Sequence, residues 1–174
     1  ELDKVVHFPE STKPDPLIPK SLIEGVSERN DCFGAVVVRL NEEEAEVAVD
    51  RLLAKGVDAI AVCFLWAFRN NKHENDVKKI VSELYPNIYV STSHEIMPLR
   101  GEYERFITTV FDCYTGPVTS KFMEALRLTL KNKGLKARLL VMKADGGSAF
   151  SDELLPVATI HSGPAGGVMG VRFL

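Results

Sequence analysis

Hydrophobic and polar residues alternate along this chain with periods that predict strands and helices in turn. Residues 34–40 are rich in β-branched side chains and predict a strand. Asn41 and Glu44 have the form of a helix capping box, and they open a helix that Gly56 closes. The apolar positions of this helix recur at helical spacing: Ala45, Ala48, Val49, Leu52 and Leu53. Residues 57–65 are apolar almost throughout, which is typical of a strand covered by helices on both faces.

A second cycle of helix and strand follows. Residues 72–85 predict a helix, and residues 88–92 predict a strand. The expected buried stripe of the helix consists of Val77, Ile80, Val81 and Leu84. This alternation of strand and helix indicates an α/β layer fold with right-handed crossovers.

The longest helical stretch runs from Glu102 to Lys133. Gly116-Pro117 interrupts it, and we expect a kink or a break there, because proline lacks an N–H group and disfavours a helical residue before it. The apolar side of its second part consists of Val118, Phe122, Ala125, Leu126, Thr129 and Leu130. Residues 137–142 predict a buried strand, Asp145-Gly146-Gly147 a tight turn, and residues 157–160 a short strand.

The segment from His161 to Gly170 is rich in glycine and predicts the entrance of a helix. Ser162 is suited to cap this helix and Pro164 to its first turn, and the free N–H groups there attract anions such as phosphate. The glycines recur at i, i+3, i+4 and i+7 and so share one face. That bare face either lets a ligand approach or allows close packing of another backbone.

The composition argues against some classes of function but does not identify one. The 174 residues are 45% hydrophobic and 26% charged, with a formal net charge of −3, as in an ordinary globular protein. With 21 basic and 24 acidic residues there is no positive excess for nucleic acid. The longest apolar run, residues 59–68, is too short to span a bilayer, and we expect no membrane partner. No signal peptide is visible, although a chain that lacks an initial Met does not show its true beginning.

The three cysteines, Cys32, Cys63 and Cys113, are odd in number and far apart. This spacing favours neither a disulfide framework nor a CxxC metal site, and it favours a reducing cytoplasmic location. Cys63 lies in an apolar run and is best interpreted as a small buried hydrophobe. No metal-ligand spacing and no Ser/His/Asp triad can be recognised, so we assign no metal ligand and no catalytic residue.

Several segments, taken in order, resemble the hydantoinase A and oxoprolinase family, which includes ATP-dependent hydantoinases, oxoprolinases and ketone carboxylase subunits. The resemblance extends from about Pro16 to the end of the chain. The matching residues are Ala61 to Leu65, Arg69-Asn70, His73-Glu74, Glu102 to Arg105, Thr108 to Val110, Gly116 to Val118, Leu140 to Met142, Gly146-Gly147 and Ser162 to Gly167. The chain departs from the family at Trp66, where many members have His, and at residues 143–145, where Gln-Ser-Asn is common.

The resemblance implies part of an actin-like ATPase architecture. Two domains related to ribonuclease H, each a mixed sheet with covering helices, would close on a nucleotide. Residues 1–33 would be a proline-rich linker and extended segment, residues 34–100 the end of the first domain, and residues 101–174 the start of the second. The family's two phosphate loops, an acidic residue followed by Gly-Gly-Thr, do not occur in this sequence. We therefore expect a fragment whose parent uses ATP and magnesium but which binds neither tightly alone.

The implied function is an ATP-dependent hydrolase that opens or activates a cyclic amide, such as a hydantoin, oxoproline or lactam, through a phosphorylated intermediate. The residues expected at the substrate or nucleotide cleft are Lys143, Asp145, Gly146, Gly147, Ser162, Gly163, Gly166 and Gly167. Lys143 is a candidate partner for an anionic substrate group, and Asp145 for a cation or a water. The expected partners are a small-molecule substrate and a second subunit or another copy of the chain.

Two other hypotheses stay open beside this one, in addition to the carboxylase branch of the family. The first is a non-catalytic α/β subdomain or interaction module that is inactive alone. The second is a doubly wound, flavodoxin-like binding domain whose glycine-rich helix holds a nucleotide, although the glycine spacing does not fit GxGxxG.

Charged residues near the expected domain junction are interpreted as surface groups. They are Arg100, Glu102, Glu104 and Arg105. Glu102 and Arg105 are three residues apart and predict a solvated ion pair, with a domain-interface role as the alternative. His73 and Glu74 are interpreted as a capping and surface pair. His161 is a candidate acid or base because of its position, and His94 is left without a role.

Overall fold

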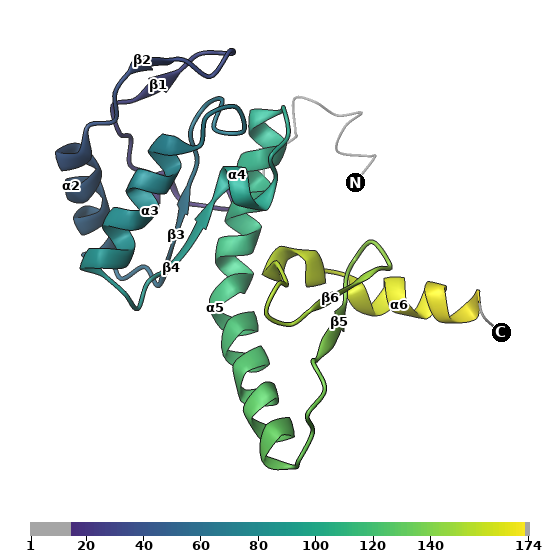
Figure 1. Ribbon diagram of the computed structural model, residues 1–174. Coiled ribbons are helices and arrows are strands. Elements are labelled where there is room, and N and C mark those ends of the chain that lie inside the picture. Colours follow the sequence, from purple (N-terminus) through teal and green to yellow (C-terminus); the bar gives the residue numbers. More distant parts are fainter. Residues whose placement is uncertain (1–14, 173–174) are drawn as a thin grey trace.

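The computed structural model describes residues 15–172, and Figure 1 shows their arrangement. Residues 1–14 of the predicted proline-rich linker, including Pro9 and Pro14, lie outside the described residues. The strands form three two-stranded sheets: β1 (Arg29–Asn30) with β2 (Val36–Val38), β3 (Ala59–Val62) with β4 (Tyr89–Thr92), and β5 (Leu140–Met142) with β6 (Ser148–Phe150). The helices are α2 (Glu42–Leu53), α3 (Lys72–Leu84), α4 (Ser93–Ile96), α5 (Glu102–Asn132) and α6 (Ser162–Val171), with short 3₁₀ turns η2 (Lys20–Leu22) and η3 (Pro156–Thr159).

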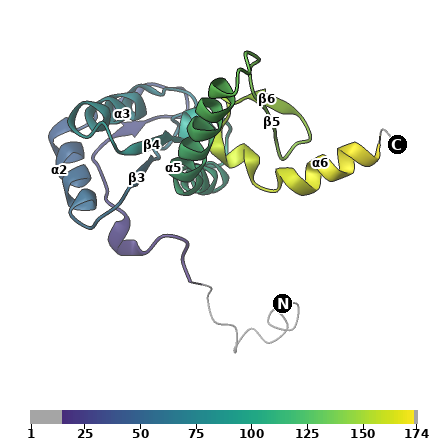
Figure 2. The same cartoon turned by 90° about the horizontal axis from the view of Figure 1, so that it is seen from below.

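The parallel pair β3–β4 is the centre of the N-terminal layer. It is paired in register from Ala59 opposite Tyr89 to Val62 opposite Thr92, and α3 connects the two strands. Helices α2 and α3 cover one face of the pair, while α5 lies against the other (Figures 1 and 2). The core of this layer consists of Ala45, Val49, Ile60, Val62, Val77 and Val81. The predicted α/β alternation is confirmed for this part of the chain.

The start of α2 shows how local sequence fixes an element boundary. The Asn41 side chain accepts a hydrogen bond from the Glu44 N–H at 3.1 Å, as the capping prediction requires. The Glu44 carboxylate does not complete the box, because it accepts instead from the Ser27 N–H at 2.9 Å. The cap therefore also ties the strand-rich entrance of the chain to α2.

Helix α5 is one continuous helix from Glu102 to Asn132. Of the predicted kink or break at Gly116-Pro117, the break is therefore wrong, and the kink stays a prediction. Much of the clash that proline imposes on the preceding residue involves that residue's Cβ, which Gly116 lacks. Gly116 is buried and lies against the ring of Tyr89 from β4. Packing against the sheet therefore keeps the helix continuous where local propensity favours an interruption.

The second half of α5 is not buried as its apolar pattern predicts. Val118 and Phe122 are 73% and 60% exposed. In Figure 1 this half of the helix extends past the β3–β4 layer, so the sheet does not cover it. Leu84, at the end of α3, is also exposed, because it lies beyond the core contacts of that helix.

The C-terminal elements differ from two further predictions. Strand β5 is short and largely exposed rather than buried, because among residues 15–172 its one partner strand is β6, with which it forms a hairpin. Residues 156–159 form the 3₁₀ turn η3 instead of a strand, with Pro156 at its first position. The glycine-rich segment does form a helix, α6. Within residues 15–172 no helix combines the length and the apolar character needed to cross a bilayer.

Candidate functional site

The loop between β5 and β6 and the glycine-rich helix α6 lie in contact. The Gly146 backbone has φ +82°, and a Cβ built there would be 3.0 Å from the Met169 side chain of α6. On the other side of the same contact, a Cβ on Gly166 would be 3.6 Å from Met142 of β5. The two predicted cleft segments are thus brought together by two methionines that pack against bare glycine backbone.

Lys143 and Asp145 pair with each other across the tight turn. The Lys143 Nζ donates to Asp145 Oδ2 at 2.8 Å, and the Gly147 N–H donates to Asp145 Oδ1 at 2.9 Å. These donors, Lys143 first, hold the pKa of the Asp145 carboxyl below its usual value. Both side chains remain accessible to solvent, with 30% and 63% exposed. An anionic ligand at Lys143 would therefore compete with Asp145.

The entrance of α6 is built differently from the prediction. His161, not Ser162, occupies the cap position, in a left-handed conformation with φ +63°, and it makes no side-chain cap bond. Ser162 is the first helical residue. The expectation that the Ser162 hydroxyl caps the helix is wrong.

The glycine face of α6 is largely open. Cβ atoms built on Gly163, Gly167 and Gly170 would meet no atom within 4 Å, and only Gly166 on this face has a neighbour. Close packing within the described part of the chain therefore does not explain most of this face. It remains accessible to a ligand or to another polypeptide.

Arg105 is fully buried, so the predicted solvated ion pair with Glu102 is wrong. Its guanidinium donates to the Ser93 hydroxyl at 3.1 Å, the Leu99 carbonyl at 2.9 Å and the Phe64 carbonyl at 3.2 Å. The same group lies over the rings of Phe68 and Phe106 at 5.4 and 5.2 Å from their centroids. Arg105 therefore joins α5 to the segments that follow β3 and β4. Arg100 and Glu104 are exposed and Glu102 is partly exposed, as surface groups are.

Glu74 is the second buried charge of this region, and its interpretation as a surface residue is wrong. Its carboxylate accepts from the Phe64 N–H at 2.9 Å and the Ser93 hydroxyl at 2.5 Å. It also accepts from the His94 N–H at 2.9 Å and lies 2.7 Å from His94 Nδ1. Four polar groups thus surround one carboxylate, and Ser93 connects it to Arg105. The strands β3 and β4 end here, where parallel sheets collect functional groups.

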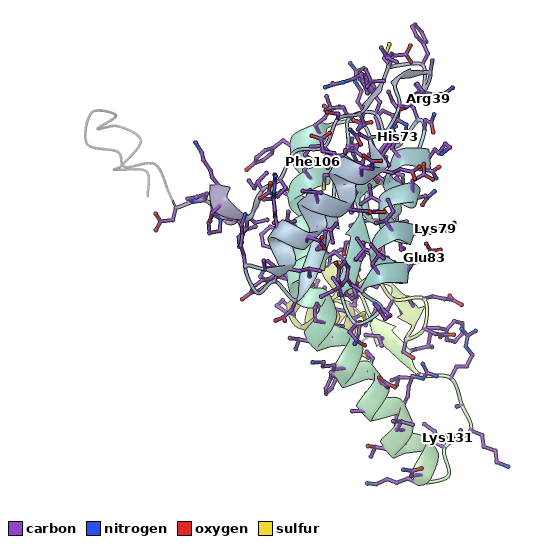
Figure 3. The ribbon with its side chains drawn as sticks, turned by 90° about the vertical axis from the view of Figure 1, so that its left-hand side faces the viewer. Arg39, His73, Lys79, Glu83, Phe106 and Lys131 are labelled. Carbon is purple, nitrogen blue, oxygen red and sulfur yellow. The ribbon has the colours of Figure 1, made fainter. Side chains whose placement is uncertain are left out.

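His73 is buried as well, beside Glu28. Its Nδ1 lies 2.9 Å from the Glu28 carboxylate. Figure 3 shows His73 together with Lys79 and Glu83, which lie further along α3 and are 73% and 64% exposed. Helix α3 therefore buries His73 and Glu74 in its first turn, while Lys79 and Glu83 lie on its solvated outer face.

A third buried charge, Asp112, lies two turns after Arg105 on α5. Its Oδ2 accepts from the Tyr89 and Ser91 hydroxyls of β4 at 3.1 and 2.8 Å, and its Oδ1 accepts from the Val157 N–H of η3 at 3.0 Å. Sequence reasoning missed Asp112 and gave Glu74 and His94 no buried role. The available signal was the series Arg105, Thr109, Asp112 and Gly116, which marks one face of a helix.

A groove in the described part of the chain lies away from these residues. It has a volume of about 850 Å³ and lies between the second half of α5 and residues 135–139 and 151–156. Among the residues that line it, none is a predicted cleft residue. Its walls include basic side chains from α5 and from the following connection: Arg127, Lys131, Lys136 and Arg138. This groove is therefore separate from the candidate cleft.

The cysteines offer a direct test of the fold. Burial raises the pKa of the Cys63 and Cys113 thiols to about 12, whereas Cys32 is exposed. We expect Ellman's reagent at pH 8 to label one thiol at once and the other two only after unfolding, because the thiolate is the reactive form. Rapid labelling of all three would contradict the packing of α5 on β3 and β4.

The same two thiols predict a loss of stability in alkaline solution. The ordinary thiol pKa is 9.0, so the unfolded chain releases these protons from about pH 9, whereas the folded chain holds them until about pH 12. The free energy of unfolding is therefore expected to fall between pH 9 and 12. Urea titrations across this range measure it, and Cys63→Ala should weaken the dependence.

Comparison with known proteins identifies the family to which this chain belongs. Residues 3–85 match the hydantoinase/oxoprolinase N-terminal region, and residues 105–174 match the hydantoinase/oxoprolinase family. The chain belongs to the hydantoinase/oxoprolinase family. The family predicted from the ordered motifs is thereby confirmed.

Three relatives show how much of a family member the chain represents. The acetophenone carboxylase gamma subunit of Aromatoleum aromaticum is 36% identical over 166 residues, which is 92% of this chain and 23% of that protein. A nucleotide-free structure of acetone carboxylase, from work on ATP-dependent acetone carboxylation, superposes with a TM-score of 0.86 at 28% identity, over 98% of this chain and 25% of that one. The crystal structure of the ATP-dependent caprolactamase from Pseudomonas jessenii gives a TM-score of 0.78 at 26% identity, over 94% and 25%. The chain thus spans about a quarter of each of these three proteins, and its α/β fold is that of the two solved structures.

Proposed function

We propose that these 174 residues form one wall of the nucleotide and substrate cleft in a cytoplasmic, ATP-dependent enzyme that acts on a cyclic amide. The observation that carries this proposal is the assembly of the Lys143–Gly147 turn with the open glycine face of α6. Its support is that two similar proteins, acetone carboxylase and caprolactamase, are described as ATP-dependent. The first domain would end near residue 100 and the second would begin near residue 101.

The proposed reaction begins with transfer of the γ-phosphoryl group of ATP to the amide oxygen. The carbonyl carbon then accepts water, the ring C–N bond breaks as the nitrogen takes a proton, and a second water releases phosphate. ADP, phosphate and the opened amino acid are the products. Within this chain, Lys143 would hold an anionic substrate group and the α6 entrance would supply N–H groups to a developing charge.

Magnesium is expected with ATP, but the residues described here do not fit it. Residues 15–172 hold no group of three or more His, Cys, Asp or Glu side chains placed to bind a metal ion. Asp145 is also bonded to Lys143 and to the Gly147 N–H, which occupies its oxygens with donors. We therefore assign no step to magnesium in this part of the protein.

The test is phosphate release by the complete polypeptide that carries this sequence. MgATP would be supplied with hydantoin, 5-oxoproline or caprolactam, and with acetone plus bicarbonate to detect the carboxylase branch. We expect one amide to stimulate hydrolysis. For an amide with a carboxylate, such as 5-oxoproline, Lys143→Ala should raise the KM about tenfold. Lys121→Ala, an exposed lysine on α5, is the control. No stimulation by any amide would overturn the proposal, and stimulation by the ketone alone would move the protein to the carboxylase branch.

A second candidate function is a non-catalytic module that needs a second subunit or another copy of the chain. It is favoured by the Lys143–Asp145 pair, which occupies both charged groups of the turn, and by the absence of an acidic residue followed by Gly-Gly-Thr from the sequence. Calorimetry of the 174-residue chain with MgATP shows whether this chain binds nucleotide by itself. Binding at micromolar concentration would overturn the module and place a phosphate site within this chain.

A further inference from the structure

Asp112 occupies a position between the two parts of the described chain. It lies on α5, which Figures 1 and 2 show between the β3–β4 layer and the C-terminal elements. Its side chain is fully buried, and one carboxylate oxygen faces β4 while the other faces η3. Its three donors are two hydroxyls and one backbone N–H, all neutral groups. A carboxylate buried in this way is stable only while it is hydrogen-bonded, so the loss of any of these three donors costs free energy.

The segment that Asp112 holds leads directly into the candidate cleft. Val157, whose N–H it accepts, lies in η3, four residues before His161 caps α6. The next residue, Ala158, accepts a hydrogen bond at 2.7 Å from the N–H of Ala144, which lies in the turn that carries Lys143 and Asp145. The turn and α6 are in turn held together by the contact of Met169 with Gly146. The hydrogen bond that Asp112 accepts from Val157, together with the packing of η3 on α5, therefore attaches a connected unit of turn, η3 and α6.

We propose that Asp112 is a positioning residue that fixes this unit on α5 and β4. The role of this unit as part of a cleft rests on the proposed function, but its anchoring by Asp112 does not. A buried carboxylate that only stabilised the fold would affect all segments alike when removed. A positioning residue acts selectively, because the β3–β4 layer keeps its own core of α2 and α3 side chains without it.

Hydrogen exchange followed by mass spectrometry on the 174-residue chain, without nucleotide, distinguishes these outcomes. In Asp112→Ala we expect amides of residues 143–147 and 157–171 to exchange at least about tenfold faster, as loss of a charge-assisted hydrogen bond predicts. Amides of β3 and α3 should stay within about twofold of the unaltered protein. Asp112→Asn should restore most of the protection, because its amide oxygen still accepts from Val157 and its nitrogen still reaches Ser91.

Controls keep the test decisive. Glu124→Gln removes an exposed carboxylate from the same helix and should change no segment. If Asp112→Ala does not fold, Ser91→Ala removes one donor from the β4 side and should speed exchange about threefold in the same amides. Equal acceleration in all segments, or none in residues 143–147 and 157–171, would overturn the proposal. Because no nucleotide is present, this failure is separate from a failure of ATP hydrolysis.

Discussion

Replacing Arg105 by alanine is expected to lower the free energy of unfolding by about 3–5 kcal/mol, the usual range when one partner of a buried charged network is removed. The guanidinium is fully buried and donates to Ser93, Leu99 and Phe64. Its removal leaves two carbonyls and a hydroxyl without their donor and opens a cavity between the rings of Phe68 and Phe106. Glu74 would then remain buried without the positive charge that Ser93 links to it.

Urea unfolding followed by far-UV circular dichroism measures this change. Arg100→Ala, at an exposed arginine just before the same helix, is the matched control and should shift the free energy by less than about 0.5 kcal/mol. Arg105→Lys keeps the charge but cannot reach three acceptors in different directions, so an intermediate loss is expected. If Arg105→Ala and Arg100→Ala behaved alike, the buried position of Arg105 would be wrong.

The elements that could be predicted are those whose local pattern and tertiary packing agree. Helices α2 and α3 and strands β3 and β4 lie within their predicted ranges, because cap, spacing and apolar content indicate the same structure. At Gly116-Pro117 the local pattern and the tertiary packing disagree, and packing against Tyr89 prevails over the local preference. Residues 157–160 have strand composition, but no neighbouring strand is present to pair with them in the described chain, and Pro156 favours a turn.

The segments of the candidate cleft could be predicted from the sequence, whereas the buried network of Arg105, Ser93 and Glu74 could not. Glycines at i, i+3 and i+4 and the Asp-Gly-Gly turn are visible in sequence, and the contact between Gly146 and Met169 joins them in space. Whether they bind nucleotide stays a prediction. Arg105 and Glu74 have the composition of surface residues, and no local pattern shows that Ser93 will lie between them. A charged side chain is buried only where partners distant in sequence surround it, so its burial can be recognised only once the fold is known.

Gly116→Ala is expected to lower the free energy of unfolding by about 1–3 kcal/mol, although alanine normally stabilises a helix by about 1 kcal/mol over glycine. A Cβ at residue 116 would lie less than 3.0 Å from the ring of Tyr89. The ring cannot move freely, because its hydroxyl donates to Asp112. Either α5 moves away from β4 or the Tyr89 bond to Asp112 breaks.

Two comparisons show whether this clash is the cause. Gly163→Ala, at a helical position where a new Cβ meets nothing within 4 Å, should leave the urea midpoint unchanged or raise it. In a double-mutant cycle, Tyr89→Leu should recover part of the loss caused by Gly116→Ala, because the smaller side chain vacates the space of the ring tip. Additive losses would contradict the contact. Because Tyr89 also donates to Asp112, a displaced ring should speed exchange at residues 157–171, so the close approach of α5 to β4 and the anchoring of η3 depend on one another.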